Sequence, residues 1–206
     1  MDTTKKHYHE EESSLPLVIF NIGVLGSMPL DVPKRLAEEY DAVHISNEHL
    51  QLPPTGTLET SIPSPTRLRA EADLKAQSEP PLADGQDILL DMFFNTPEDR
   101  HFPINLAHHS GALAVALCFH TPFRVARRRV LDWTAKGSFK VPVERWAKSP
   151  YLVTRSMMKH IKWPNQENID YVFNLDGNTY TEAILDEYNT YLGWYRLVKS
   201  NPSPDS

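Results

Sequence analysis

The residues with the clearest chemical potential lie in a short loop, Gly23 to Leu30, that follows an almost wholly apolar run. Gly23 and Gly26 are its glycines, and Ser27 adds a hydroxyl. A glycine-containing loop between a strand and a helix can bind a phosphate through its backbone N–H groups. Such a loop also occurs in many α/β proteins for structural reasons alone. The loop is therefore a candidate phosphate site that needs support from its context.

Compared with the phosphate-loop pattern G-x-x-x-x-G-K-[ST], only Gly23 fits. Met28 stands at the second glycine, Pro29 at the lysine and Leu30 at the hydroxyl that binds magnesium. Proline supplies neither the positive charge nor a backbone N–H, and leucine cannot bind a metal. Since phosphoryl transfer depends on positioning and electrostatics, these departures predict impaired or unusual use of ATP.

The elements around this loop predict an α/β domain. Helical segments alternate with short apolar runs, which lie near residues 17–22, 42–46, 87–92, 113–119 and 170–175. This alternation predicts a mainly parallel sheet covered by helices on both faces. Ligands in such sheets bind beyond the carboxyl ends of the strands.

Some helix ends carry their own signals. A helix should begin near Ser64-Pro65, run to about Gln77 and end before Pro80-Pro81. The stretch Thr96-Pro97-Glu98-Asp99 should begin another helix. A later helix should begin at Thr121-Pro122 and end at Gly137. It should bury one face, formed by Phe123, Ala126, Val130 and Trp133.

Three blocks in this order resemble P-loop kinases of the zeta-toxin and polynucleotide-kinase group. They are Gly23 to Leu50, Asp87 to Thr96, and Cys118 through the arginine-rich helix after Pro122. The resemblance covers roughly Leu15 to Leu197 and implies a three-layer α/β/α, P-loop NTPase-like domain over residues 15–198. It also implies a partly helical lid near 136–165. Residues 1–14 and 199–206 are expected to be flexible tails.

The resemblance also implies roles for side chains. Glu48 matches the acid that deprotonates or orients the substrate hydroxyl. Asp91 matches the strand-end acid near the magnesium ion. Arginines of the lid region would neutralise the transferred phosphoryl group, and the candidates are Arg127, Arg128, Arg145 and Arg155. Each of these residues also has a structural alternative. Glu48 could be an exposed capping residue, Asp91 could cap the following turn, and the arginines could form a basic helix face exposed to solvent.

Bulk properties limit the partners. The formal charge of the 206 residues is -6, which disfavours but does not exclude nucleic acid. Cys118 is the single cysteine, no signal peptide begins the sequence, and no apolar run has the length of a membrane span. A cytoplasmic protein that does not enter a membrane is therefore expected. The histidines match no known spacing of metal ligands.

Two functions remain open. In the first, a nucleotide, ATP or GTP with Mg²⁺, donates a phosphoryl group to a hydroxyl of a small molecule or a nucleic-acid end. In the second, the chain is a catalytically inactive pseudokinase that binds a protein partner or regulates it. Pro29 favours the second function, whereas Glu48, Asp91 and the arginines favour the first.

Overall fold

The apolar runs of the sequence form one parallel sheet. The computed structural model describes residues 15–46, 65–137, 150–165 and 167–200. Within these ranges the strands are β1 (Leu17–Ile22), β2 (Val43–Ser46), β3 (Ile88–Phe93), β4 (Leu113–His120) and β5 (Tyr171–Asp176). Their order across the sheet is β2-β3-β1-β4-β5, and every neighbouring pair is parallel. The predicted strands and their parallel arrangement are confirmed.

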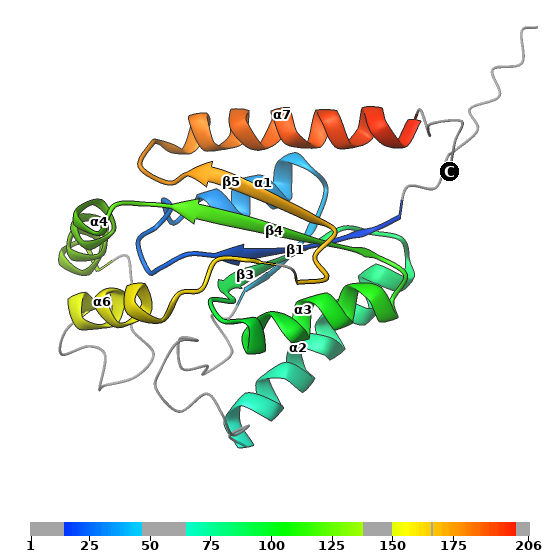
Figure 1. The fold of residues 1–206 in the computed structure, drawn as a ribbon, viewed down its shortest axis with the longest axis horizontal. Coiled ribbons are helices and arrows are strands. Elements are labelled where there is room, and N and C mark those ends of the chain that lie inside the picture. Colours follow the sequence, from blue (N-terminus) through cyan, green and yellow to red (C-terminus); the bar gives the residue numbers. More distant parts are fainter. Residues whose placement is uncertain (1–14, 47–64, 138–149, 166, 201–206) are drawn as a thin grey trace, which may run out of the picture.

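Helices cover both faces of this sheet (Figure 1). The described helices are α1 (Val32–Glu39), α2 (Pro65–Ala83), α3 (Pro97–His109), α4 (Phe123–Ala135), α6 (Pro150–His160) and α7 (Thr181–Ser200). One core cluster joins α2 and α3 to the sheet through side chains such as Leu74 and Ile104. A second cluster joins α1 and α7 to the opposite face through Leu36 and Ile184. The predicted three-layer α/β/α architecture is therefore confirmed.

The middle strands are almost completely buried because helices cover both of their sides. All six residues of β1 are buried, and β4 is buried from Ala114 to Phe119. Strands covered on both faces lack the alternating pattern of half-buried strands, which is why β1 reads as a continuous apolar run. Both strands direct their carboxyl ends toward α4 and α6 (Figure 1).

Two helix ends follow the sequence and one does not. Thr96 and Asp99 form the capping box that begins α3. Gly137 follows the C-cap of α4 with φ +66°. The predicted end of α2 before Pro80-Pro81 is wrong, because the helix continues to Ala83. Burial of Leu82 in the core stabilises this last turn against the helix-breaking prolines.

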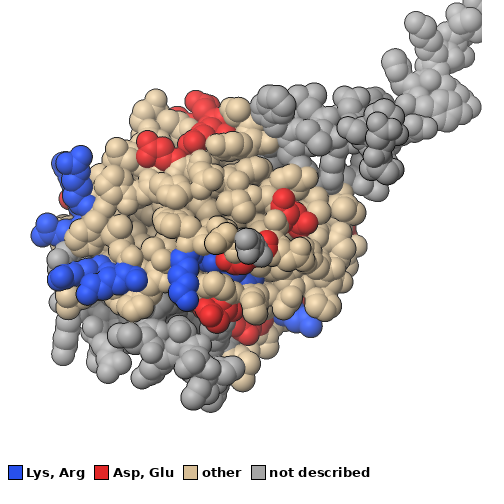
Figure 2. Space-filling model, in the orientation of Figure 1, with Lys and Arg blue, Asp and Glu red and all other residues tan. Residues whose placement is uncertain are grey.

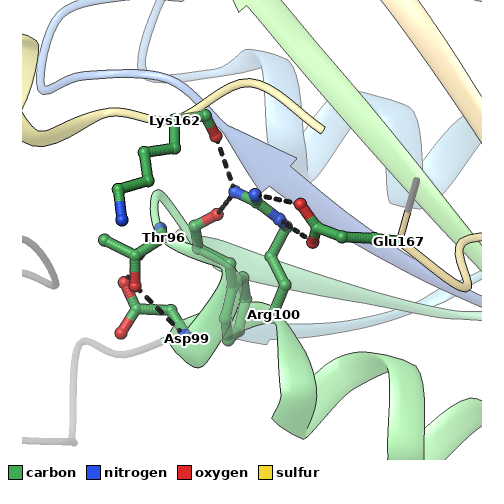
Figure 3. Close-up of polar contacts among 6 residues, drawn as sticks. Thr96, Asp99, Arg100, Lys162 and Glu167 are labelled. Atoms are coloured by element: carbon green, nitrogen blue, oxygen red, sulfur yellow. Dashed lines mark hydrogen bonds and ion pairs between the residues drawn. The ribbon is translucent and has the colours of Figure 1, made fainter. Parts of the chain in front are cut away.

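A buried arginine fixes the chain that follows α6 (Figure 3). Arg100 of α3 is fully buried and donates to both carboxylate oxygens of Glu167, with Nε 2.6 Å from Oε2. It also donates to the carbonyls of Phe94 at 3.1 Å and Lys162 at 2.9 Å. The paired carboxylate and the two carbonyls compensate the buried charge. The segment between α6 and β5 is thereby held against the end of β3.

Candidate functional site

The loop between β1 and α1, residues 23–31, packs against a helix. The N–H of Ser27 donates to the carbonyl of Val24 at 2.8 Å, which closes a turn. Gly26 has φ +87°, a conformation that favours glycine. A methyl group at this position would overlap the carbonyl oxygen of Ala126 in α4. The loop and the helix are therefore in backbone contact, and Gly26 has a structural reason to be glycine.

Neighbouring elements bind the carbonyl groups of the loop. Thr154 of α6 donates its hydroxyl to the carbonyl of Leu25 at 3.3 Å. Thr121, which follows β4, donates to the carbonyl of Ser27 at 2.6 Å. Phosphate cradles instead bind their anion through successive backbone N–H groups. The contacts found at this loop fix its conformation from two other elements of the chain.

Arg129 of α4 is the centre of these contacts. Its Nη1 donates to the carbonyls of Gly26 at 3.2 Å and Ser27 at 3.1 Å. The same nitrogen donates to the carbonyl of Gly177 at 2.6 Å, and Nη2 donates to that of Thr179 at 2.7 Å. One guanidinium group thus joins α4, the loop after β1 and the turn after β5. We call this arrangement the Arg129 clamp.

The clamp holds a positive charge at the loop. Burial lowers the pKa of Arg129, and the nearby carboxylate of Asp176 opposes this change. Arginine nevertheless remains charged at neutral pH, because its pKa is far above 7. Carbonyl dipoles from two segments therefore solvate this cation.

The apolar side chains of the loop belong to the core. Val24 is buried with Ala126 and Met157 in a small cluster between the loop, α4 and α6. Met28, which stands where the phosphate-loop pattern has glycine, is buried among the residues under α1 and α7. The methionine is therefore a packing residue, and the loop is held by apolar contacts as well as by hydrogen bonds.

Solved kinases share this architecture. A gluconokinase from Sinorhizobium meliloti 1021 has a TM-score of 0.60 and 21% sequence identity, over 90% of this chain and 95% of that chain. A sugar kinase from Janibacter sp. HTCC2649 has a TM-score of 0.60 and 14% identity, over 87% and 95%. Chaetomium thermophilum Kti12, solved in complex with ADP-AlF3, has a TM-score of 0.60 and 15% identity, over 84% and 97%.

The chain has the P-loop kinase fold. No protein-family model matches it, and no curated protein matches it by sequence. The finer resemblance to zeta toxins and polynucleotide kinases remains a prediction.

Gly23 and Ser27, two of the residues predicted to bind the cofactor, lie close together in the loop after β1. The N–H of Gly23 donates to Asn95 Oδ1 at 3.1 Å, so a buried side chain occupies this donor. A side chain on Gly23 would approach the hydroxyl of Ser27 within 2.5 Å. Ser27 is itself fully buried. Both residues are buried, and their predicted role in binding a cofactor stays a prediction.

Asp91 lies before the end of its strand. The β1–β3 register passes from Phe20↔Leu90 directly to Asn21↔Phe93, so Asp91 lies in a bulge of β3. Its Oδ2 is 3.1 Å from Nε2 of His44 on β2, and both side chains are about 30% exposed. An extended strand rises about 3.3 Å per residue, which separates Asp91 from Phe93 by about 7 Å.

Phe93 holds the position beside the loop. Its ring carbon Cε1 would lie 3.3 Å from a side chain on Gly23, and the side chain packs against the small cluster that contains Val24. A P-loop kinase that binds Mg²⁺ benefits from an acid near the phosphates. The residue of β3 nearest the loop in this chain is aromatic.

The predicted arginines lie on outer surfaces. Arg127 and Arg128 are exposed on α4, and Arg155 is exposed on α6. Arg128 is 85% exposed and lies 4.0 Å from Asp132. Glu48 and Arg145 lie outside the described residues, so their predicted roles stay predictions.

Sequence reasoning missed Arg129 for a geometrical reason. At 100° per residue, Arg127 and Arg129 lie symmetrically on the two flanks of the face that buries Ala126 and Val130. Helical periodicity therefore assigns both arginines the same environment. The docking of α4 on the loop decides that Arg129 faces inward.

The nucleotide and the Mg²⁺ ion that the fold family implies do not fit the described residues of this loop. Pro29 has no N–H, and Leu30 presents a 44% exposed apolar side chain where the pattern requires a hydroxyl. Among the described residues, no three His, Cys, Asp or Glu side chains come together as a metal site. The same part of the chain also lacks a helix that is long and apolar enough to cross a membrane.

Proposed function

We propose that this chain is a pseudokinase, a P-loop kinase fold without phosphoryl transfer that acts as a protein-binding or regulatory module. The Arg129 clamp is the observation that carries the proposal. Its guanidinium binds the loop carbonyls of Gly26 and Ser27, while the backbone of α4 lies against Gly26. The chain's own groups therefore hold the loop in its conformation.

The chemistry of phosphoryl transfer supports this proposal. Transfer requires a cation on the β- and γ-phosphates and a metal ion held near them. Pro29 and Leu30 supply neither. Arg129 brings a cation to the loop, but four carbonyl groups hold it, and Gly177 and Thr179 belong to a different segment. Turning the guanidinium toward a phosphate would break these contacts.

A second candidate function is phosphoryl transfer to a hydroxyl group. The pair of His44 and Asp91, 3.1 Å apart and partly exposed, favours it because a carboxylate and an imidazole can exchange a proton with a substrate. ATP or GTP would be the donor. The acceptor would be a small hydroxyl compound, for which the gluconokinase and sugar kinase of similar fold suggest a sugar acid or a sugar.

Calorimetric titration with ATP, ADP and GTP, each with and without MgCl2, tests the proposal. We expect dissociation constants weaker than about 0.1 mM that Mg²⁺ does not improve, equivalent to less than about 5.5 kcal/mol of binding free energy. Submicromolar, magnesium-dependent affinity for ATP would refute the pseudokinase proposal.

One double variant separates the causes of weak nucleotide binding, and one single variant tests the second candidate function. If the closed loop prevents binding, Pro29→Lys with Leu30→Ser should change the affinity for Mg·ATP by less than about threefold, because the clamp persists. A tenfold gain, about 1.4 kcal/mol, would instead show that only the two side chains were missing. Any transfer to gluconate or other sugars should disappear in Asp91→Asn, and its persistence would exclude the second candidate's base.

A further inference from the structure

The outer face of α4 is a stripe of cations with one leucine. Arg124, Arg127, Arg128 and Leu131 are all exposed and recur at i, i+3, i+4 and i+7, which places them on one side of the helix. Ala126 and Val130 bury the opposite side. The stripe points away from the loop that Arg129 contacts.

Helix α6 repeats this arrangement. Leu152, Arg155 and Lys159 are exposed at i, i+3 and i+7, while Thr154 and Met157 are buried. The two helices pack against each other. We call these two exposed stripes the α4–α6 surface, and it consists of Arg124, Arg127, Arg128, Leu131, Leu152, Arg155 and Lys159.

The charge of this surface opposes that of the whole chain. The sequence has a formal charge of -6, yet within residues 123–137 and 150–160 the single acid is Asp132. That acid lies 4.0 Å from a highly exposed arginine, a geometry that stabilises little. Figure 2 shows several Lys and Arg side chains at the left end of the molecule, where Figure 1 places α4 and α6, and others nearer its centre.

The local stability of α4 does not explain why Arg124 stands in its first turn. The first turn of α4 has no acidic residue and begins after Pro122, which makes no side-chain cap. Arg124 lies in that turn, where the helix dipole disfavours a positive charge. Arg124 therefore opposes the local stability of α4, as is common for residues that serve recognition.

We propose that the α4–α6 surface binds an acidic amphipathic segment of a partner protein. The arginines and the lysine would contact its carboxylates. Leu131 and Leu152, 44% and 58% exposed, would contact its aliphatic side chains. Phosphate backbones offer no aliphatic surface, so the two leucines favour a protein over a nucleic acid. This proposal rests on the pseudokinase function proposed above and names the class of its partner. The residues that would bind the partner lie outside the loop after β1.

Selection from a displayed library of random peptides against the full-length protein tests the inference. We expect enrichment of peptides that combine Asp or Glu with Leu, Ile or Val. The most enriched peptide, labelled with fluorescein, should bind in a fluorescence anisotropy titration. Its affinity should fall at least tenfold in Arg124→Glu/Arg127→Glu/Arg128→Glu and about fivefold in Leu131→Ser/Leu152→Ser. Added salt should weaken the binding.

A matched variant controls for net charge. Lys34→Glu/Arg69→Glu/Lys75→Glu reverses three exposed cations on α1 and α2, so its charge change equals that of the triple arginine variant. It should retain the peptide affinity within about twofold. An equal loss of peptide affinity in both triple variants would show that net charge alone determines the binding, and it would overturn the inference. Failure to enrich acidic peptides would also overturn it.

A single-stranded RNA oligonucleotide tests the competing class of partner. Equal or tighter binding of the oligonucleotide, with no effect of the leucine substitutions, would assign the surface to nucleic acid and refute the inference. Nucleotide titration of the unaltered protein distinguishes this result from the proposed function. Tight Mg·ATP binding would contradict the pseudokinase proposal and leave the peptide result standing.

Discussion

The Arg129 clamp can be tested by its contribution to stability. Replacing Arg129 with methionine keeps an unbranched apolar stem and removes all five N–H donors. The substitution leaves the carbonyls of Gly26, Gly177 and Thr179 without the donor that binds them, whereas the carbonyl of Ser27 retains the hydroxyl of Thr121. The substitution therefore weakens the attachment of α4 to two segments, the loop after β1 and the turn after β5.

The distances give the expected magnitude. The bonds to Gly177 and Thr179, at 2.6 and 2.7 Å, are short, and the bonds to Gly26 and Ser27, at 3.2 and 3.1 Å, are longer. A hydrogen bond to a charged group contributes about 1.5–3 kcal/mol, from which the desolvation of the half-buried guanidinium subtracts. We therefore expect Arg129→Met to lower the free energy of unfolding by about 3 kcal/mol.

Urea unfolding followed by tryptophan fluorescence measures this loss, with an unchanged m value as the criterion for a native fold. For a chain of this length the midpoint of thermal unfolding should fall by about 6–12 °C. Arg129→Lys should lose about half as much, because an ammonium group keeps the charge but cannot reach carbonyls on both segments. Arg128→Met is the control, since Arg128 is 85% exposed, and it should change stability by less than about 0.5 kcal/mol.

Equal effects of Arg129→Met and Arg128→Met, within about 0.5 kcal/mol, would refute the clamp. The loop would then be held by its apolar side chains and by the hydroxyls of Thr121 and Thr154, and the pseudokinase proposal would lose its main support.

Three further predictions concern buried groups. Gly26→Ala should destabilise the protein by more than about 2 kcal/mol through overlap with the backbone of α4, whereas Gly85→Ala, with φ +76° but open space around it, should cost only about 1 kcal/mol in urea unfolding. Glu167→Gln should cost about 3 kcal/mol in the same assay, because it leaves the buried guanidinium of Arg100 without its carboxylate; a loss below 1 kcal/mol would contradict this role. Burial raises the pKa of Cys118 to about 12, so a thiol reagent at pH 8 should react only after unfolding; rapid reaction of the native protein would show that β4 opens.

The sequence alone determined the elements of the fold. Strands buried on both faces must be apolar throughout, so the run of β1 could be identified without its neighbours. Thr96 and Gly137 mark helix ends through contacts within a few residues. The alternation of strands and helices then implied a parallel sheet. All of these signals are local, because each depends on the backbone and solvent exposure of one segment.

The tertiary structure alone decided how the site is arranged. The bulge that places Asp91 before Phe93 depends on the pairing of β3 with β1, which no local pattern encodes. Arg127 and Arg129 flank the same buried face of α4, and only the docking of that helix on the loop directs Arg129 inward. Residues that interact across about 100 positions leave no periodic signal in either segment. The conformation of the loop is therefore a property of packing, whereas its missing lysine is visible in the sequence.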